Sequence, residues 1–225
     1  MVTTVHRWRF TPTEYARMAE VGIFDAGDAV ALLDGELVVQ PTDGIARPYR
    51  FTATQYELLG EFGILDEDRH MELINGEIIA MSAMGRRHAR CIDQLTLLLA
   101  RTIPDGLFVH VQNPVQLDRG NVPEPDLAVI VDHGPDSPAV SAADALLVIE
   151  VSDSTLAYDT GDKLSRYAAA HIPEYWVVNL PDGTLTRYTE PVGRTYKQTT
   201  VARSGDALPS LTVPALRIPV ADILH

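Results

Sequence analysis

Two stretches decide the fold: DLAVIV at residues 126–131 and LLVIEVS at residues 146–152. Each is almost wholly apolar apart from its carboxylate, a composition typical of central strands covered on both faces. Predicted helices and strands alternate around them, which indicates one sheet flanked by helices, an α/β (α+β) class. If the two strands are neighbours, the carboxylates of Asp126 and Glu150 meet at one point on the sheet.

Working outward from this pair, apolar periodicity and turn residues predict the flanking elements. The predicted helices cover residues 86–103 and 155–170. Further strands are predicted at residues 107–117, 175–179, 185–188 and 196–202.

The N-terminal half contains a duplication with a period of 41 residues. The residues Arg9–Tyr15 match Arg50–Tyr56, and Leu33–Glu36 matches Ile74–Glu77. Each copy reads as a helix opened by a Thr cap, a loop, and a hairpin that turns at Asp-Gly or Asn-Gly. We therefore expect three parts: a degenerate duplicate at 1–49, a main core at 50–205, and a C-terminal surface segment at 206–225.

The two copies differ at Glu72, which stands opposite Ala31 of the first copy. A carboxylate present in only one copy indicates a working copy and a packing copy. The alternative is that Glu72 lies on a solvated strand face.

The carboxylates of Asp126 and Glu150 indicate metal chemistry. An unpaired carboxylate inside an apolar strand costs several kcal/mol unless it is paired or bound to a metal. Two hard oxygen ligands without a histidine or thiolate favour Mg²⁺ or Mn²⁺ over zinc.

A lysine follows on the next predicted helix. Asp159, Lys163 and Tyr167 are spaced four apart, so they share one helix face. The alternative is an ordinary Asp–Lys pair on a solvated helix. Because this helix directly follows the Glu150 strand, we expect Lys163 to point toward the carboxylates and to stabilise charge on a phosphoryl oxygen.

Several motifs together resemble the Uma2 family of the PD-(D/E)XK restriction-endonuclease-like superfamily. They are Glu72, the VPEPD run at 122–126, VIEVSDST at 148–155, Lys163 with its neighbours, and PEYWVV at 173–178. The resemblance covers about residues 51–202 and implies a restriction-endonuclease-like mixed central sheet flanked by helices. The duplicated helix-hairpin segment found above begins before this range.

The resemblance also implies roles for single residues. Asp126 and Glu150 would bind the divalent ion, Glu72 would complete the metal shell, and Lys163 would be the catalytic lysine. The superfamily places its lysine two residues beyond the acidic residue, where this chain has Ser152. His88 matches a recurrent position of the family, although a lone histidine on an apolar helix face is also typical of a hydrogen-bonded core residue.

These observations predict an Mg²⁺-dependent (or Mn²⁺-dependent) endonuclease that hydrolyses the phosphodiester bonds of DNA. The net charge of −13 opposes nucleic-acid binding, because such proteins usually carry a basic stripe. Two alternatives therefore stay open: a non-catalytic binding or assembly protein on a nuclease-derived fold, and a metal-dependent hydrolase of smaller phosphate esters. The sequence does not decide between DNA, RNA and a small ester.

Location and assembly follow from weaker signals. No stretch is long and apolar enough to cross a bilayer, and the N-terminal residues lack the apolar run of a secretory signal, so we expect a cytoplasmic protein. The single cysteine, Cys91, fits a reducing compartment and is interpreted as a small core residue. Cutting two DNA strands favours a two-fold homodimer.

Overall fold

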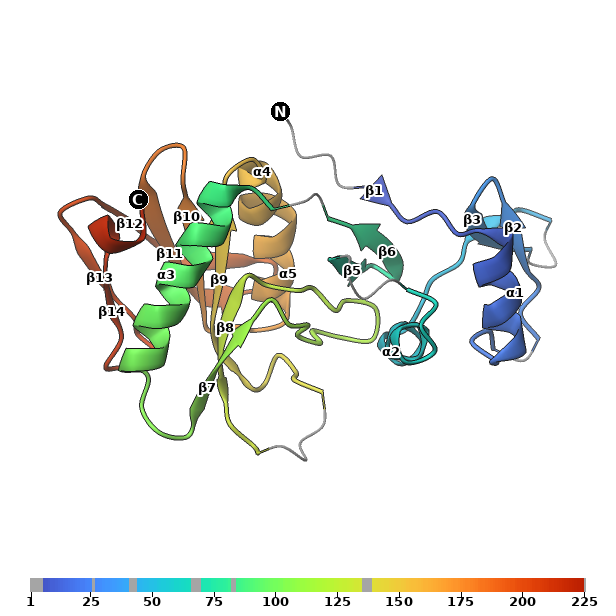
Figure 1. Ribbon diagram of the computed structural model, residues 1–225, viewed down its shortest axis with the longest axis horizontal. Coiled ribbons are helices and arrows are strands. Elements are labelled where there is room, and N and C mark those ends of the chain that lie inside the picture. Colours follow the sequence, from blue (N-terminus) through green and yellow to red (C-terminus); the bar gives the residue numbers. More distant parts are fainter. Residues whose placement is uncertain are drawn as a thin grey trace. The chain divides into compact units, whose positions relative to one another are not determined.

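The computed structural model describes residues 6–25, 27–40, 44–65, 70–81, 84–134 and 139–224. These residues divide into two compact units (Figure 1). The sheet unit contains residues 84–117 and 124–224, and the duplicated unit contains residues 6–81 and 118–123. Within the described ranges, no helix is long and apolar enough to cross a membrane.

The sheet unit is built on a six-stranded sheet with the strand order β12-β11-β10-β9-β8-β7. Strands β9 and β10 run parallel, and every other neighbouring pair is antiparallel, which confirms the predicted mixed sheet. The strands are β7 (Leu107–Val111), β8 (Leu127–Val131), β9 (Ala145–Ser152), β10 (Glu174–Asn179), β11 (Thr184–Val192) and β12 (Thr195–Arg203).

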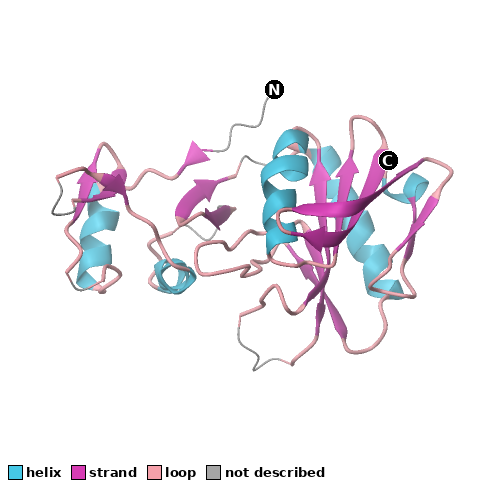
Figure 2. Cartoon of the chain, turned by 180° about the vertical axis from the view of Figure 1, so that it is seen from behind, coloured by secondary structure: helices cyan, strands magenta, loops and turns pink. Residues whose placement is uncertain are grey.

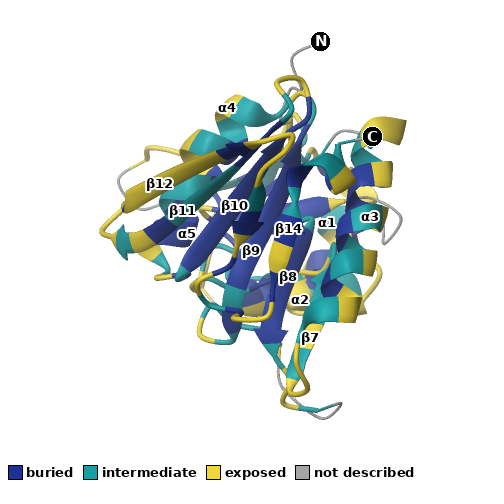
Figure 3. Ribbon diagram, turned by 90° about the vertical axis from the view of Figure 1, so that its left-hand side faces the viewer, coloured by how far each residue is buried: buried dark blue, intermediate teal, exposed yellow. Residues whose placement is uncertain are grey.

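Helices cover both faces of this sheet (Figure 2). The helix α3 (Arg86–Thr102) packs on one face, and α5 (Leu164–Ala169) packs on the other. The central strands β8, β9 and β10 are accordingly buried, whereas much of the edge strand β12 is exposed (Figure 3). The two apolar stretches of the sequence are therefore central strands, as predicted.

The strand β7 is shorter than the predicted strand at 107–117. It ends at Val111 because Gln112 adopts a left-handed backbone with φ of 50°. The Gln112 N–H then donates to the backbone oxygen of Asp126 at 3.1 Å. This bond ties the end of β7 to the residue that precedes β8.

The C-terminal segment packs onto the α3 face of the sheet. It contains β13 (Ala207–Pro209), β14 (Arg217–Pro219) and a 3₁₀ turn at Val220–Ile223. We predicted a surface segment here, but six of its apolar side chains are buried in the core: Leu208, Val213, Leu216, Ile218, Val220 and Ile223.

A buried carboxylate fastens this segment to the sheet. Glu174 is fully buried, and its side chain accepts bonds from Trp176 Nε1 at 2.7 Å and Ser210 Oγ at 2.7 Å. The backbone N–H groups of Leu211 and Thr212 donate to it at 2.9 and 3.0 Å. The neighbouring Tyr175 and Trp176 are wholly buried, so their interpretation as core residues is confirmed.

The duplicated unit repeats one helix and one hairpin. The first copy has α1 (Pro12–Glu20), β2 (Val30–Leu33) and β3 (Glu36–Val39). The second copy has α2 (Ala53–Glu61), β5 (Met71–Ile74) and β6 (Glu77–Ala80). Each helix begins at a Thr capping box, as the sequence predicts.

Equivalent atoms make equivalent bonds in the two copies. The Phe10 N–H donates to Gly35 O at 2.8 Å, and the Phe51 N–H donates to Gly76 O at 2.9 Å. Each bond has its match 41 residues away, so the duplication predicted from the sequence is also a duplication of structure.

The copies exchange their leading strands. The strand β1 (His6–Arg7) precedes the first copy and pairs with β6 of the second, while β4 (Arg47–Pro48) precedes the second copy and pairs with β3 of the first. Because each hairpin depends on a strand from the other copy, the two copies form one folded unit with a shared core.

Candidate active site

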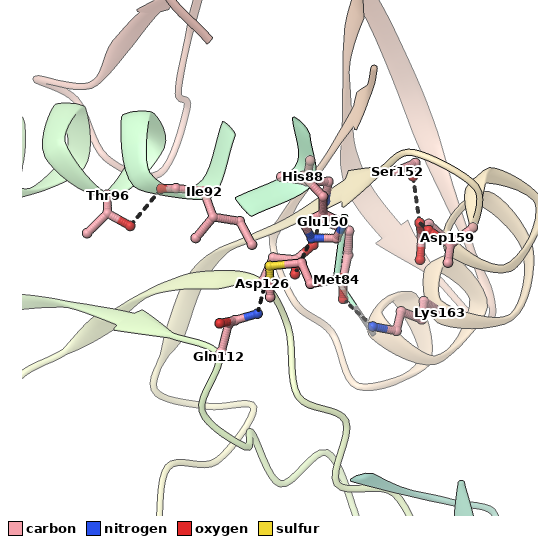
Figure 4. Close-up of polar contacts among 12 residues, drawn as sticks. Met84, His88, Ile92, Thr96, Gln112, Asp126, Glu150, Ser152, Asp159 and Lys163 are labelled. Atoms are coloured by element: carbon pink, nitrogen blue, oxygen red, sulfur yellow. Dashed lines mark hydrogen bonds and ion pairs between the residues drawn. The ribbon is translucent and has the colours of Figure 1, made fainter. Parts of the chain in front are cut away.

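Asp126 lies where β8 begins. The register pairs Leu127 with Ile149, so residue 126 stands opposite Glu150 on β9. The Val151 N–H donates to Asp126 Oδ2 at 2.7 Å, and Asp126 Oδ1 lies 2.9 Å from His88 Nε2 (Figure 4). Both carboxylate oxygens are therefore oriented, one by the sheet and the other by α3.

Glu150 forms a buried ion pair with Lys163. Lys163 Nζ lies 2.9 Å from Glu150 Oε1, and both side chains are only 4% exposed. The Tyr167 hydroxyl donates to the same oxygen at 2.8 Å. The alternative of a solvated Asp–Lys pair at 159 and 163 is therefore wrong, since Asp159 is buried as well.

A widened helical turn carries Lys163. The predicted continuous helix at 155–170 is instead α4 (Leu156–Tyr158), a π-turn at Asp159–Lys163, and α5. At its end the Leu164 N–H bonds to Asp159 O, five residues back. Such π-bulges add one residue to a turn and are frequent at functional sites. Four-residue spacing alone gives no sign of the inserted residue.

Asp159 anchors the π-turn. Its Oδ2 accepts bonds from Ser152 Oγ at 2.5 Å and Thr155 Oγ1 at 2.6 Å, and its backbone oxygen accepts a bond from the Tyr175 hydroxyl at 2.9 Å. Burial raises the pKa of the Asp159 carboxyl, although the charge of Lys163 and the two hydroxyl bonds oppose that rise.

His88 is held by Asp126 rather than by apolar neighbours alone. Burial disfavours the charged imidazole, but the hydrogen bond and the charge of Asp126 outweigh it and raise the pKa of His88. One turn later on α3, Cys91 is buried, which confirms it as a small core residue, and burial raises the pKa of its thiol to about 12.

The Uma2 family model, described as "Putative restriction endonuclease", matches residues 53–221 of the 225-residue chain. The chain belongs to the Uma2 family.

A solved structure supports the fold. It is a protein from Anabaena variabilis whose title calls it a "putative nuclease belonging to DUF820". The two structures superpose with a TM-score of 0.60 at 15% identity, over 74% of this chain and 96% of that one. None of the curated proteins compared with the chain matches it. Family and fold together place the chain among nuclease-like proteins.

This Uma2 chain fills the superfamily's usual lysine position with a buried serine. Ser152 is 0% exposed, and its hydroxyl binds Asp159 at the start of the π-turn. The residue in the lysine's place therefore anchors the segment that carries Lys163 to Glu150.

Glu72 lies on β5 in the duplicated unit, in register with Ile79 of β6. It is only 1% exposed, so the alternative of a solvated strand face is wrong. Because it belongs to the other unit, its participation in this site stays a prediction.

The donor set fits a magnesium-like ion in part. Within the described ranges, no group of three or more His, Cys, Asp or Glu side chains gathers as a ready metal cage. Mg²⁺ is commonly held by only one or two carboxylates, with water and substrate phosphates completing the shell. Asp126, at the start of β8, and Glu150, on the paired strand β9, would supply two such carboxylates, and His88 contacts Asp126 as an outer partner of a ligand would.

Proposed function

We propose that this protein is a Mg²⁺- or Mn²⁺-dependent endonuclease that hydrolyses phosphodiester bonds of DNA, with Asp126, Glu150 and Lys163 at its centre. The observation that carries the proposal is the contact between Lys163 Nζ and Glu150 Oε1 in a strand position opposite Asp126. The lysine comes from another segment, yet it reaches the same end of the sheet as both carboxylates.

Asp126 and Glu150 would hold the divalent ion. When bound, such an ion polarises the scissile phosphate and lowers the pKa of a water that attacks it. The Val151 N–H and His88 keep the Asp126 carboxylate in one orientation, and the Tyr167 hydroxyl does the same for Glu150. These partners reduce the reorganisation needed when the substrate binds.

Lys163 has two tasks in this proposal. Its ammonium neutralises Glu150 while the site is empty of substrate, which lowers the cost of burying that carboxylate. In the reaction the same ammonium stabilises negative charge that develops on the phosphoryl oxygens. The buried Asp159–Ser152 bond keeps the π-turn, and with it Lys163, in place.

Glu72 enters the proposal as a third acidic group that would complete the metal shell or accept a proton. Replacing each carboxylate with its amide tests the role of that residue alone. Asp126→Asn and Glu150→Gln should each abolish cleavage, whereas Glu72→Gln should reduce it. Loss of cleavage in the Asp126 and Glu150 variants, a partial loss in the Glu72 variant and none in a control would support these roles. Parent-rate cleavage by the Glu72 variant would remove Glu72 from the proposal.

The test is Mg²⁺-dependent nicking of supercoiled plasmid DNA, followed on agarose gels. Asp93→Asn is the matched control, since Asp93 is an exposed carboxylate on α3 of the same unit. We expect activity with Mg²⁺ or Mn²⁺, none in EDTA, and normal activity in the control. Cleavage by a folded Glu150→Gln protein at the parent rate would refute the assignment.

A second candidate is hydrolysis of a smaller phosphate ester. The net charge of −13 favours it, because a small substrate needs no basic groove. The same metal-loaded protein should be offered linear DNA, RNA, and aryl or nucleoside phosphates. Cleavage confined to the small esters would replace the endonuclease proposal while keeping the site.

A homodimer belongs to the endonuclease proposal, because two copies related by a two-fold axis would cut both strands. Light scattering after size-exclusion chromatography gives the mass directly. The proposal expects about twice the chain mass of 24.7 kDa. A measured protein mass of one chain, both without DNA and with DNA bound, would refute the homodimer.

A further inference from the structure

The duplicated unit contains a cavity of about 540 Å³ that the proposed nuclease site does not use. This volume lies within the range of sites that hold small molecules. Both copies contribute to its wall, together with the turn at 118–120. The charged and polar residues that line it are Asp25, Asp28, Arg47, Tyr49, Arg50, Thr52, Asn75 and Arg119.

Three arginines converge on this cavity from separate parts of the chain. Arg47 lies on β4, Arg50 precedes α2, and Arg119 lies in the turn at 118–120. The whole chain has a net charge of −13, whereas three arginines and two carboxylates line this cavity, which is a small local excess of positive charge. Guanidinium groups bind phosphate through paired, charge-assisted hydrogen bonds.

Backbone bonds hold the segments that carry Arg119 and Arg47, and side-chain bonds to Asn75 and Glu77 hold Arg50. The Ala53 N–H donates to Arg119 O at 2.7 Å, and the Gly76 N–H donates to Gly120 O at 2.8 Å, so the turn is tied to the second copy. Arg50 Nη1 donates to Asn75 O at 2.9 Å. The cavity wall is therefore assembled before any ligand arrives.

Two residues at or beside this cavity are replaced at the matching positions of the first copy. Forty-one residues earlier, Arg47 becomes His6, and Ala53 becomes Pro12. Proline has no N–H, so the bond that holds Arg119 against the second copy has no counterpart in the first. The duplication thus creates two similar positions, and only one of them carries three arginines.

We propose that this cavity binds a phosphorylated small molecule of nucleotide size. The guanidinium groups of Arg47 and Arg119 take the phosphate, while Arg50, which is ion-paired with Glu77, forms part of the wall. The carboxylates of Asp25 and Asp28 accept bonds from hydroxyl or amino groups of the ligand. The N-terminus of α2 is not the anion site, because the Thr52 and Gln55 side chains already bond to its free N–H groups. This role gives the first copy a function, since it supplies the carboxylates.

Isothermal titration calorimetry with the full chain tests the proposal. The probes are the four nucleoside 5′-monophosphates, the matching nucleosides, ribose 5-phosphate and inorganic phosphate, all in EDTA. We expect at least one nucleotide to bind, and its nucleoside, which lacks the phosphate, to bind at least tenfold more weakly. Binding of inorganic phosphate as tight as any nucleotide would overturn the size of the proposed ligand, and no binding of any probe at millimolar concentration would overturn the site.

Variants locate the binding. Arg119→Ala and Arg47→Ala remove exposed side chains and should each weaken nucleotide binding about tenfold or more. Arg194→Ala is the control, because Arg194 is an exposed arginine of the sheet unit. Equal affinity in all three variants would place the ligand elsewhere and refute the proposal.

One more probe distinguishes a free nucleotide from the 5′ end of a nucleic-acid strand. A 5′-phosphorylated oligonucleotide that displaces the nucleotide identifies a strand end as the ligand, whereas failure to displace it identifies the free nucleotide. Glu150→Gln should retain nucleotide binding whether or not the nuclease proposal holds. A loss of binding in that variant would contradict a separate site in the duplicated unit.

Discussion

Replacing Lys163 with Met tests how the buried ion pair is balanced. The two charged side chains are each only 4% exposed, and their atoms are 2.9 Å apart. Methionine keeps the length of the side chain and removes its charge, which leaves a buried carboxylate at Glu150 with the Tyr167 hydroxyl still donating to it. Breaking a buried pair in this way costs about 3–5 kcal/mol. In a chain of this size such a loss lowers Tm by about 6–20 °C.

The double variant measures the interaction free energy between Glu150 and Lys163. Glu150→Gln alone leaves a buried ammonium and should cost a similar amount. Glu150→Gln with Lys163→Met leaves neither charge, so we expect it to lose only about 0–3 kcal/mol in total. The coupling free energy between the two positions should therefore be about 3 kcal/mol or more.

Urea unfolding followed by circular dichroism in EDTA measures all four proteins without bound metal. Asp93→Asn is the control, because Asp93 is an exposed carboxylate on α3, and surface substitutions usually change stability by about 0.5 kcal/mol or less. Additive losses in the double variant, or a loss below about 1 kcal/mol for Lys163→Met, would refute the buried pair.

Three further predictions concern stability and reactivity. The pKa of the Asp144 carboxyl is lowered, chiefly because the Ser141 hydroxyl and N–H donate to it. The ionised carboxylate therefore stabilises the fold above its ordinary pKa of about 3.9, and this stabilisation is lost as pH falls through the lowered pKa. Asp144→Asn should be less stable than the parent at pH 7 and equally stable in acid. Thermal unfolding across pH measures this, and a constant gap would contradict it. In Gly76→Ala the new Cβ would lie 2.9 Å from Arg50 Cβ and 3.0 Å from the backbone oxygen of Phe51, whereas in Gly22→Ala, at nearly the same φ, it meets nothing within 4 Å. Gly76→Ala should therefore lower the free energy of unfolding by about 1–3 kcal/mol more than Gly22→Ala, as measured by urea unfolding. Equal losses in the two variants would exclude the clash. The thiol of Cys91, with its pKa raised to about 12, should react with a disulfide reagent only as fast as the protein unfolds, and rapid labelling of the folded protein would contradict its burial.

The sheet and its two carboxylates could be predicted from the sequence because their signals are local. Apolar runs covered on both faces predict central strands, and one carboxylate at the edge of each run predicts where they meet. The pairing of Leu127 with Ile149 confirms that the two strands are neighbours, and the shared site of the two carboxylates stays a prediction. The repeat of 41 residues was equally visible, since it needs only the comparison of the chain with itself.

Other features depend on partners that sequence spacing does not reveal. Asp159, at the start of the π-turn, accepts hydrogen bonds from Ser152, Thr155 and Tyr175. These bonds exist only once the chain has folded. The bond from the Val151 N–H to Asp126 depends on where β8 begins. Both are tertiary effects that override local helix and strand patterns.

The exchange of leading strands was also invisible in the sequence. Strands β1 and β4 have two residues each, too few to show any periodicity. The cavity beside β4 was missed for a related reason, because its three arginines are spread from residue 47 to residue 119. Only the folded duplicated unit brings them together.

The most direct measurement is an anomalous difference map from crystals soaked in Mn²⁺. The account predicts one strong peak in contact with the carboxylates of both Asp126 and Glu150, and its disappearance in crystals of Glu150→Gln. A peak elsewhere, or none beside these two side chains in a crystal with that end of the sheet open to solvent, would contradict it.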